Sequence, residues 1–160
     1  MSTVELLYKA LLAHNMKLAT AESCTGGMVA AAITDIAGSS SVFERGFVTY
    51  SNEAKSEMLD VSAELIVSVG AVSREVALAM AQGALDHSNA DISVAITGIA
   101  GPSGGSPDKP VGLVHFAVAR QGAGAIHNVQ KFGNLPRSEI RAKATAHALT
   151  LVLDQIDLAP

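Results

Sequence analysis

A short strand, a glycine turn and a helix follow one another near the start of the chain, and no other feature restricts the fold so strongly. Residues 17–21 form a brief, mostly apolar run that leads into the turn ESCTGG at residues 22–27. The alanine-rich residues 25–36 then place Val29 and Ile33 on one helical face. A buried strand that turns directly into a helix is typical of α/β domains.

The rest of the chain repeats this alternation of helix and strand. Periodicity, capping residues and β-branched runs predict further helices at residues 2–14, 52–59, 62–69, 73–87 and 136–155, and further strands at residues 46–51, 92–97, 112–120 and 125–132. The last two strands flank a short glycine-containing turn, which predicts an antiparallel hairpin. We therefore predict an α/β fold, a single three-layer α/β/α domain over residues 1–160, with a mixed, mostly parallel sheet of about five strands.

Composition excludes several classes of function. The formal net charge of −4 gives no electrostatic basis for binding nucleic acid or an anionic membrane. The single cysteine, Cys24, excludes an intrachain disulfide and fits a reducing compartment, and no apolar run approaches the length of a membrane span. No cluster of His, Cys, Asp or Glu has the spacing of metal ligands. We expect a cytoplasmic protein that needs neither a metal nor a cofactor.

Two glycine-rich loops follow predicted strands and are the natural place for chemistry. In open α/β sheets, ligands bind beyond the carboxyl ends of the strands, and here these ends lead into residues 21–27 and 97–112. The first loop also enters a helix N-terminus, whose partial positive charge favours a phosphate, a thiolate or an oxyanion. Neither loop has a Walker or dinucleotide-binding spacing, so the glycines alone do not identify a ligand.

The turn at residues 22–27 contains two candidate nucleophiles. Ser, Thr and Gly are common where helices begin, so composition alone is consistent with a simple turn. Cys24 is intrinsically the more reactive group, although free cysteines are often buried packing residues. Ser23 needs a neighbouring base before its hydroxyl can attack. Glu22 has two open roles, which are to orient the turn or to orient a ligand.

A base for Ser23 can be sought among the histidines and lysines. None of the five histidines lies in a recognisable catalytic pair, and His115 and His127 on predicted strands fit structural roles. Lys55 lies one helical turn beyond the second predicted strand, near the edge where ligands bind. A lysine acts as a base when burial lowers its pKa, although an exposed helical lysine is the simpler interpretation. Tyr50 ends the same strand, either as an active-site hydrogen-bonding group or as a half-buried strand end.

Four blocks of sequence resemble, in order and spacing, the CinA C-terminal domain family. These blocks are AESCTGG (Ala21–Gly27), GFVTYSNEAK (Gly46–Lys55), GAVSREVALAMAQGA (Gly70–Ala84) and VAITGIAGPSGGSPDKPVGLV (Val94–Val114). The resemblance runs from about Leu6 to Leu153. The family includes nicotinamide-nucleotide amidohydrolases, and its fold is a three-layer α/β/α domain with a mixed sheet.

The resemblance implies hydrolysis of the carboxamide of nicotinamide mononucleotide, which yields nicotinic acid mononucleotide and ammonia in pyridine nucleotide recycling. It also implies that Ser23 is the nucleophile, that Lys55 is the general base and that Tyr50 supports this pair. Cys24 then becomes a packing residue. Two alternatives remain, a non-catalytic nucleotide-binding or regulatory domain and a serine amidase that acts on a different amide.

This mechanism requires donors for an oxyanion and for a phosphate. The candidates are Thr25, Gly26 and Gly27 for the oxyanion, and Thr97, Gly98, Gly101, Gly104, Gly105 and Arg141 for the substrate, with Arg137 as an alternative to Arg141. The family pattern G-D-R-x-x-[IV]-R differs in this chain, because Asn134 replaces the Asp and lies two residues further from Arg137. A ligand contact assigned to that Asp therefore does not carry over, whereas the Arg-x-x-x-Arg spacing does.

The expected partner is a small-molecule nucleotide, without nucleic acid or membrane. Alanine-rich helices offer flat surfaces, which favours a homo-oligomer in which a second subunit lends residues to the pocket. Larger CinA proteins carry an N-terminal nucleotide-binding domain that a 160-residue chain is expected to lack, so the activities of that domain are not transferred. A role in competence or DNA damage has no support in the charge pattern.

Overall fold

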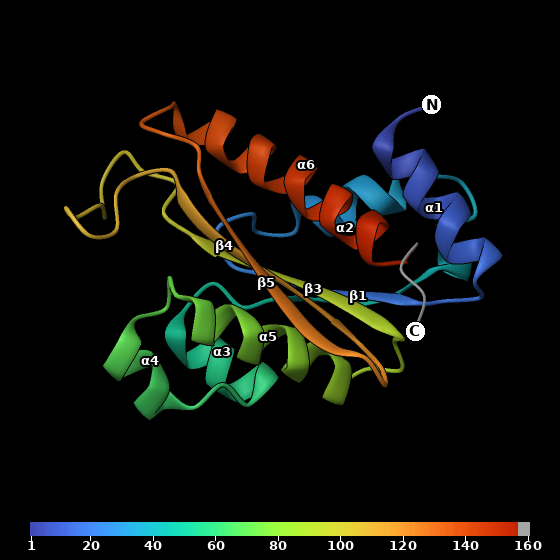
Figure 1. Cartoon of the computed structure of the whole chain (residues 1–160), viewed down its shortest axis with the longest axis horizontal. Coiled ribbons are helices and arrows are strands. Elements are labelled where there is room, and N and C mark those ends of the chain that lie inside the picture. Colours follow the sequence, from blue (N-terminus) through green and yellow to red (C-terminus); the bar gives the residue numbers. More distant parts are fainter. Residues whose placement is uncertain (157–160) are drawn as a thin grey trace.

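The computed structural model describes residues 1–156 and arranges them in three layers (Figure 1). The strands are β1 (Leu18–Glu22), β2 (Phe43–Val48), β3 (Ile92–Gly98), β4 (Leu113–Arg120) and β5 (Gly124–Lys131). The helices are α1 (Thr3–Ala13), α2 (Met28–Thr34), α3 (Asn52–Leu59), α4 (Ala63–Val69), α5 (Arg74–Asp86) and α6 (Arg137–Ile156), with one 3₁₀ turn, η1 (Ser39–Ser41). The five strands form the middle layer in the order β2-β1-β3-β4-β5, with α1, α2 and α6 on one face and α3, α4 and α5 on the other.

The sheet is mixed in the way the sequence predicts. Strand β1 pairs in parallel with both β2 and β3, whereas β4 runs antiparallel to both β3 and β5. Among the strands of residues 1–156, β4 alone runs against the other four. The predicted hairpin near the end of the chain is β4–β5. The carboxyl ends of β1, β2 and β3 meet at one edge, which is where the two glycine-rich loops begin.

Serine caps account for the accuracy of most predicted helix starts. Ser2 and Glu5 form a reciprocal capping box at α1, in which the Glu5 N–H donates to Ser2 Oγ and the Ser2 N–H donates to Glu5 Oε2. The same type of cap, a serine hydroxyl that accepts from a first-turn N–H, is made by Ser51, Ser62 and Ser73 at α3, α4 and α5. These signals are local in sequence, so they can be identified without knowledge of the fold.

Two element boundaries differ from the prediction. The predicted helix over residues 25–36 is shorter, because Gly26 and Gly27 are left-handed, with φ of 57° and 103°, and α2 cannot begin before Met28. The predicted strand over residues 46–51 lies about three residues earlier, at β2. Its charged start, Glu44-Arg45, was missed because an edge strand accepts exposed charges that a central strand would exclude.

The two faces of the sheet carry side chains of very different size. On the α5 face the inward positions of β1, β3 and β4 are mostly alanine, namely Ala19, Ala21, Ala95, Ala117 and Ala119. The opposite face carries Leu18, Ile92, Val94, Ile96, Val114, Phe116 and Val118 beneath α1, α2 and α6. The small residues let α5 approach so closely that Ser93 Oγ donates to the Ala81 carbonyl at 2.6 Å.

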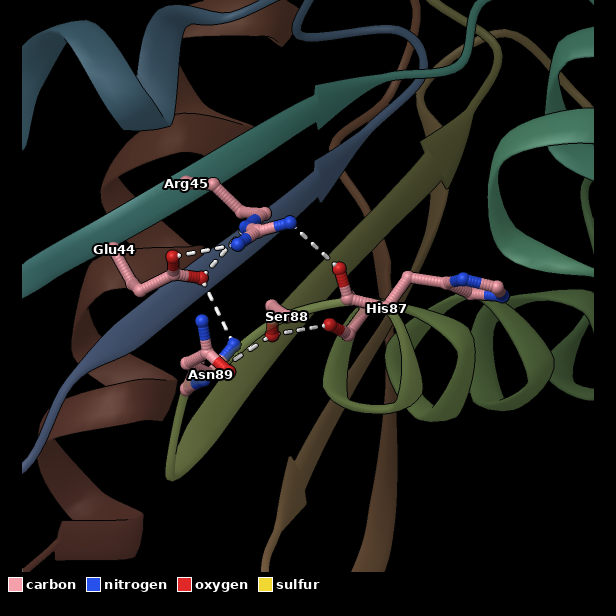
Figure 2. Close-up of polar contacts among 7 residues, drawn as sticks. Glu44, Arg45, His87, Ser88 and Asn89 are labelled. Atoms are coloured by element: carbon pink, nitrogen blue, oxygen red, sulfur yellow. Dashed lines mark hydrogen bonds and ion pairs between the residues drawn. The ribbon is translucent and has the colours of Figure 1, made fainter.

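The β2 edge is closed by a polar cluster (Figure 2). A β-bulge at Glu44 separates the pairs Leu18–Phe43 and Ala19–Arg45. Glu44 accepts from the Arg45 guanidinium at 2.7 and 2.9 Å and from the Asn89 N–H at 3.0 Å. Arg45 also donates to the His87 carbonyl at 3.0 Å. The bulge and its charges tie β2 to the α5–β3 connection and oppose pairing of this edge with another sheet.

The alanine residues along one face of α5 pack within the molecule. Ala77, Ala81 and Ala84 form a small-residue stripe on α5 and are fully buried within the molecule. These residues consequently offer no flat surface to a second subunit, and homo-oligomer formation stays a prediction that needs another basis. Within residues 1–156, no helix combines the length and apolar character needed to cross a bilayer.

The close approach of α3 and α5 makes Gly83 sensitive to substitution. A Cβ atom at Gly83 would collide with the Leu59 backbone carbonyl, which cannot move as a flexible side chain would. We expect Gly83→Ala to lower the free energy of unfolding by about 2 kcal/mol, although alanine is the better helix former. Urea unfolding checks this, with the exposed Gln82→Ala as the control, which should change stability by less than about 0.5 kcal/mol. A Gly83→Ala variant as stable as the wild type would contradict the close packing.

Candidate active site

The turn after β1 places Ser23 at the junction of three parallel strands. The Ser23 N–H donates to the Ile96 carbonyl of β3 at 3.0 Å, and the Thr49 N–H after β2 donates to the Glu22 carbonyl at 2.9 Å. The Ser23 carbonyl accepts from the Gly26 N–H at 3.1 Å, which closes the turn. Both backbone groups of Ser23 are therefore fixed, and only its side chain keeps rotational freedom.

Lys55 reaches Ser23 from α3 through a buried path. Its Nζ lies 2.9 Å from Ser23 Oγ, 2.8 Å from the Thr49 carbonyl and 3.2 Å from the Tyr50 carbonyl. The lysine is only 1% exposed, although it belongs to a short helix whose residues are mostly polar. The structure thus brings together the two residues that the family resemblance pairs across 32 positions.

Burial changes the acid–base character of Lys55. Desolvation lowers the pKa of its ammonium group to about 8, because the apolar surroundings disfavour the charged form. Within residues 1–156 no carboxylate forms an ion pair with Nζ that would oppose this effect. A neutral amine has two N–H donors and one lone pair. The Thr49 and Tyr50 carbonyls can accept hydrogen bonds from the two N–H groups. The lone pair of Nζ is then free to accept the hydroxyl proton of Ser23.

Cys24 is poorly placed to act as the nucleophile. Its side chain is 6% exposed, and burial raises the pKa of the thiol to about 11. At neutral pH the group is therefore a thiol rather than the reactive thiolate. The helix N-terminus that could have stabilised a thiolate is already occupied, because the Glu22 side chain accepts from the Val29 and Ala30 N–H groups of α2.

Glu22 orients the turn rather than a ligand. Its fully buried carboxylate accepts from Thr25 Oγ1 at 2.6 Å, from the Val29 N–H at 2.9 Å and from the Ala30 N–H at 3.1 Å. All three donors belong to the turn or to the first residues of α2. Of the two roles that the sequence left open, the contacts support the first.

The two arginines of α6 have different positions. Arg141 donates from Nε to the Cys24 carbonyl at 3.0 Å and from a terminal nitrogen to the Thr25 carbonyl at 3.3 Å, so it holds backbone in this structure. Arg137 donates to the Gly101 carbonyl at 2.6 Å and to the Tyr50 hydroxyl at 3.0 Å. Tyr50 is 61% exposed, and its hydroxyl meets Arg137 rather than Ser23 or Lys55.

A cavity of about 280 Å³ opens beside Ser23 and Lys55. Its lining residues are Ser23, Cys24, Tyr50, Asn52, Lys55, Ala71, Val72, Thr97, Gly98, Ile99, Ala100, Gly101, Ser103, Gly104 and Arg137. Thr97 Oγ1 donates to the Ala71 carbonyl at 2.9 Å and so fixes the wall formed by the α4–α5 connection. The sequence gives no indication that Ala71 and Val72 line a site, because their side chains are small and apolar and carry no reactive or hydrogen-bonding group.

Five of the predicted site residues lie outside this cavity. Gly105 lines a neighbouring open hollow of about 620 Å³, which shares Ser103 and Gly104 with the cavity. Thr25, Gly26, Gly27 and Arg141 do not line the cavity. Thr25 is fully buried, and the Gly26 N–H already donates to the Ser23 carbonyl. Asn52 and Ser103, which the sequence analysis did not single out, do line the cavity.

The paired histidines lie away from the cavity. His115 Nδ1 and His127 Nε2 are 2.9 Å apart on β4 and β5, and burial lowers the pKa of both rings. Neither residue lines the cavity beside Ser23. In the part of the chain that the structure describes, no group of three or more His, Cys, Asp or Glu residues is arranged to hold a metal ion.

Known proteins with the same fold carry related sequences. The chain is 51% identical over 155 residues to the nicotinamide-nucleotide amidohydrolase PncC of Escherichia coli K12, covering 97% of this chain and 93% of that protein. It is 52% identical over 151 residues to a protein of Symbiobacterium thermophilum named as competence-damage inducible, covering 89% of this chain but only 35% of that longer protein. The crystal structure of the competence/damage inducible protein CihA from Agrobacterium tumefaciens superposes with a TM-score of 0.91 at 46% identity, covering 99% of this chain and 98% of that one.

The family comparison extends over almost the whole chain. The CinA C-terminal domain matches residues 1–156, which include the Ser23 turn, Lys55 and both arginines of α6. The similarity to the E. coli relative covers nearly the same range, so it is not confined to one glycine loop. The chain belongs to the CinA C-terminal domain family.

Proposed function

We propose that this protein hydrolyses the carboxamide of nicotinamide mononucleotide to nicotinic acid mononucleotide and ammonia. The observation that carries the proposal is the 2.9 Å contact between Ser23 Oγ and a buried Lys55 whose pKa is lowered to about 8. A serine beside a neutral amine is a nucleophile–base pair suited to attack on an amide carbonyl. The relative from E. coli, which is named for this substrate class, is 51% identical to the chain over 155 aligned residues.

The reaction follows from the two side chains. Ser23 Oγ attacks the carboxamide carbon, and its proton passes to the lone pair of Lys55 Nζ. The resulting ammonium gives a proton to the amide nitrogen as the C–N bond breaks, so ammonia leaves and Ser23 carries the acyl group. Water then attacks this ester and gives a proton to Lys55, which returns it to Ser23 as the acid is released.

The oxyanion of the tetrahedral intermediate needs donors that face the cavity. Thr25, Gly26 and Gly27 are the residues predicted for this role, but none of them lines the cavity. Thr25 is also fully buried, and the Gly26 N–H already donates to the Ser23 carbonyl. The N–H of Cys24, the residue after the nucleophile, is a better candidate because Cys24 lines the cavity. In many serine hydrolases the residue after the nucleophile supplies such a donor.

Arg137 is the natural partner of the substrate phosphate. It lines the cavity, and the two hydrogen bonds described for it leave other N–H donors of its guanidinium available for a phosphate. Arg141 is held by two backbone carbonyls and does not line the cavity, so it is the weaker of the two sequence candidates. The cationic nicotinamide ring would further favour the neutral form of Lys55 by charge repulsion.

Substitution of the dyad tests the proposed reaction directly. We expect the wild type to release ammonia and nicotinic acid mononucleotide, and Ser23→Ala and Lys55→Met to lose roughly 1,000-fold or more in kcat. Cys24→Ala should keep activity within about threefold, because its thiol takes no part. Product chromatography and an ammonia assay provide the measurement.

The same assay separates the competing functions. Activity that survives in Ser23→Ala but disappears in Cys24→Ala would overturn the nucleophile assignment. Thermal stabilisation by the mononucleotide without product would favour a non-catalytic binding domain. Turnover of other amides from a panel, with none for the mononucleotide, would favour a serine amidase of different specificity.

The lowered pKa of Lys55 predicts how activity depends on pH. The free enzyme needs neutral Lys55 as the base, so kcat/KM should rise with pH and level off above about 8. Initial rates at low substrate concentration between pH 6 and 10 measure this, within the range where the protein stays folded. A profile that is flat across pH 8 would contradict a lysine base.

Stability provides a control that does not depend on substrate. Between about pH 8 and 10.5 the unfolded chain keeps the Lys55 proton while the folded protein has lost it, so the wild type gains stability as pH rises. The gain relative to Lys55→Met should reach about 3 kcal/mol over this range and be absent below about pH 7. Urea unfolding of both proteins across this range gives the difference.

The phosphate assignment predicts a substrate-dependent effect of Arg137→Ala. We expect KM for nicotinamide mononucleotide to rise roughly 10- to 100-fold, because a charged hydrogen-bonding group is lost. Nicotinamide riboside, which lacks the phosphate, should lose less than about threefold in kcat/KM. Arg45→Ala, in the polar cluster of β2 and outside the cavity lining, is the matched arginine control and should leave the kinetics of both substrates unaffected. Equal losses for the two substrates would show that Arg137 does not recognise the phosphate.

A further inference from the structure

We infer that Glu22 and Arg141 are positioning residues that clamp the nucleophile turn from two sides and thereby hold Ser23 against Lys55. The inference deepens the proposed amide hydrolysis and rests on it. Neither side chain lines the cavity, so each would act through the turn rather than on the substrate.

Glu22 holds the donors of the turn. Its buried carboxylate accepts hydrogen bonds from the Thr25 hydroxyl and from the Val29 and Ala30 N–H groups in the first turn of α2, at 2.6–3.1 Å. A buried carboxylate with this set of donors resists rotation, because any other orientation would leave charge or N–H groups unpaired. Residues Thr25 to Ala30 are thus tied to the residue that immediately precedes Ser23.

Arg141 holds the acceptors of the same turn. Its guanidinium donates to the carbonyls of Cys24 and Thr25, across 117 and 116 positions of sequence. Two bonds from one planar group fix the orientation of both peptide planes. They also polarise the Cys24–Thr25 peptide, next to the nucleophile.

The turn needs this support because its backbone is intrinsically adaptable. Gly26 and Gly27 occupy left-handed conformations that glycine reaches easily and also leaves easily. Ser23 must keep its 2.9 Å contact with Lys55 and also meet the substrate carbonyl. Small displacements of a nucleophile reduce rate strongly, since about 1 Å can change it by about 100-fold.

The Glu22 contacts have a consequence for substrate binding. A helix N-terminus is an anion site, and the sequence suggested that α2 could bind the ligand there. In the folded protein the Glu22 carboxylate fills that site. The phosphate must therefore bind elsewhere, which is consistent with Arg137 at the cavity.

The Thr25 hydroxyl allows a test by nearly isosteric variants. Thr25→Val removes the donor to Glu22 while keeping the side-chain shape, and should lower kcat for nicotinamide mononucleotide at least about tenfold with KM changed less than about twofold. Thr25→Ser retains the hydroxyl and should recover kcat to within about threefold of the wild type. Equal activity of the two variants would overturn the role of Glu22.

Arg141 can be tested by chemical rescue. Arg141→Ala should lower kcat more than tenfold with little change in KM, and added guanidinium ion at low, non-denaturing concentration should restore part of it. A purely structural role predicts no saturable rescue of kcat. The controls are Arg45→Ala, which should keep wild-type kcat and show no guanidinium effect, and thermal melting of every variant.

A covalent probe separates failure of the inference from failure of the proposed function. An arylsulfonyl fluoride reacts with an activated serine by forming an O–S bond and releasing fluoride, while the hydroxyl proton passes to the base. Mass spectrometry should locate the label on Ser23 in the wild type, with at least about tenfold slower labelling in Arg141→Ala and Thr25→Val. Labelling of this pattern without deamidation would contradict only the proposed substrate. Equal labelling rates in the wild type and the two variants would overturn the clamp. Absence of label from wild-type Ser23 would instead contradict the nucleophile assignment, and the inference that rests on it.

Discussion

The burial of one lysine amine determines how the functional edge of this molecule is built. Lys55 Nζ has lost nearly all contact with water, and its described polar neighbours are Ser23 Oγ and two backbone carbonyls. Carbonyl oxygens satisfy N–H groups without the full charge compensation that a carboxylate would give, so the neutral form of the amine is favoured. This arrangement requires that the end of β2, the start of α3 and the turn after β1 converge within hydrogen-bond distance. The acid–base character of Lys55 therefore depends on the correct folding of all three segments.

The difference in side-chain size between the two faces of the sheet also affects the position of the cavity wall. Alanines on one face allow α5 to lie close to β1, β3 and β4, and the connection that precedes α5 then reaches the end of β3. There Thr97 Oγ1 donates to the Ala71 carbonyl, so the cavity wall that Ala71 and Val72 form is anchored to the sheet. Larger side chains under α5 would push this wall outward. The size pattern of the core thus helps to set the width of the cavity.

Sequence predicted what depends on local signals and missed what depends on distant pairing. Serine caps, a central apolar strand and a glycine turn gave most elements, whereas β2 was displaced because an edge strand tolerates charges in its first residues. The pairing of Ser23 with Lys55 came from the family resemblance, since neither residue type reveals a partner 32 positions away. Arg141 shows the limit most clearly. An arginine can donate to a phosphate or to a backbone carbonyl, and only the fold decides which group it meets.

The spacing of the two arginines links the proposed phosphate site to the turn that carries Ser23. Arg137 and Arg141 are four residues apart on α6, so their side chains leave the same face of one helix. One reaches the cavity beside Tyr50, and the other reaches the turn that carries Ser23. The helix itself is anchored to the core by Ile140 and Ala144, which are fully buried. A rigid helix with these contacts fixes the distance between the proposed phosphate site and the turn that carries Ser23, so the Arg-x-x-x-Arg spacing matters even where the residues before it differ from the family pattern.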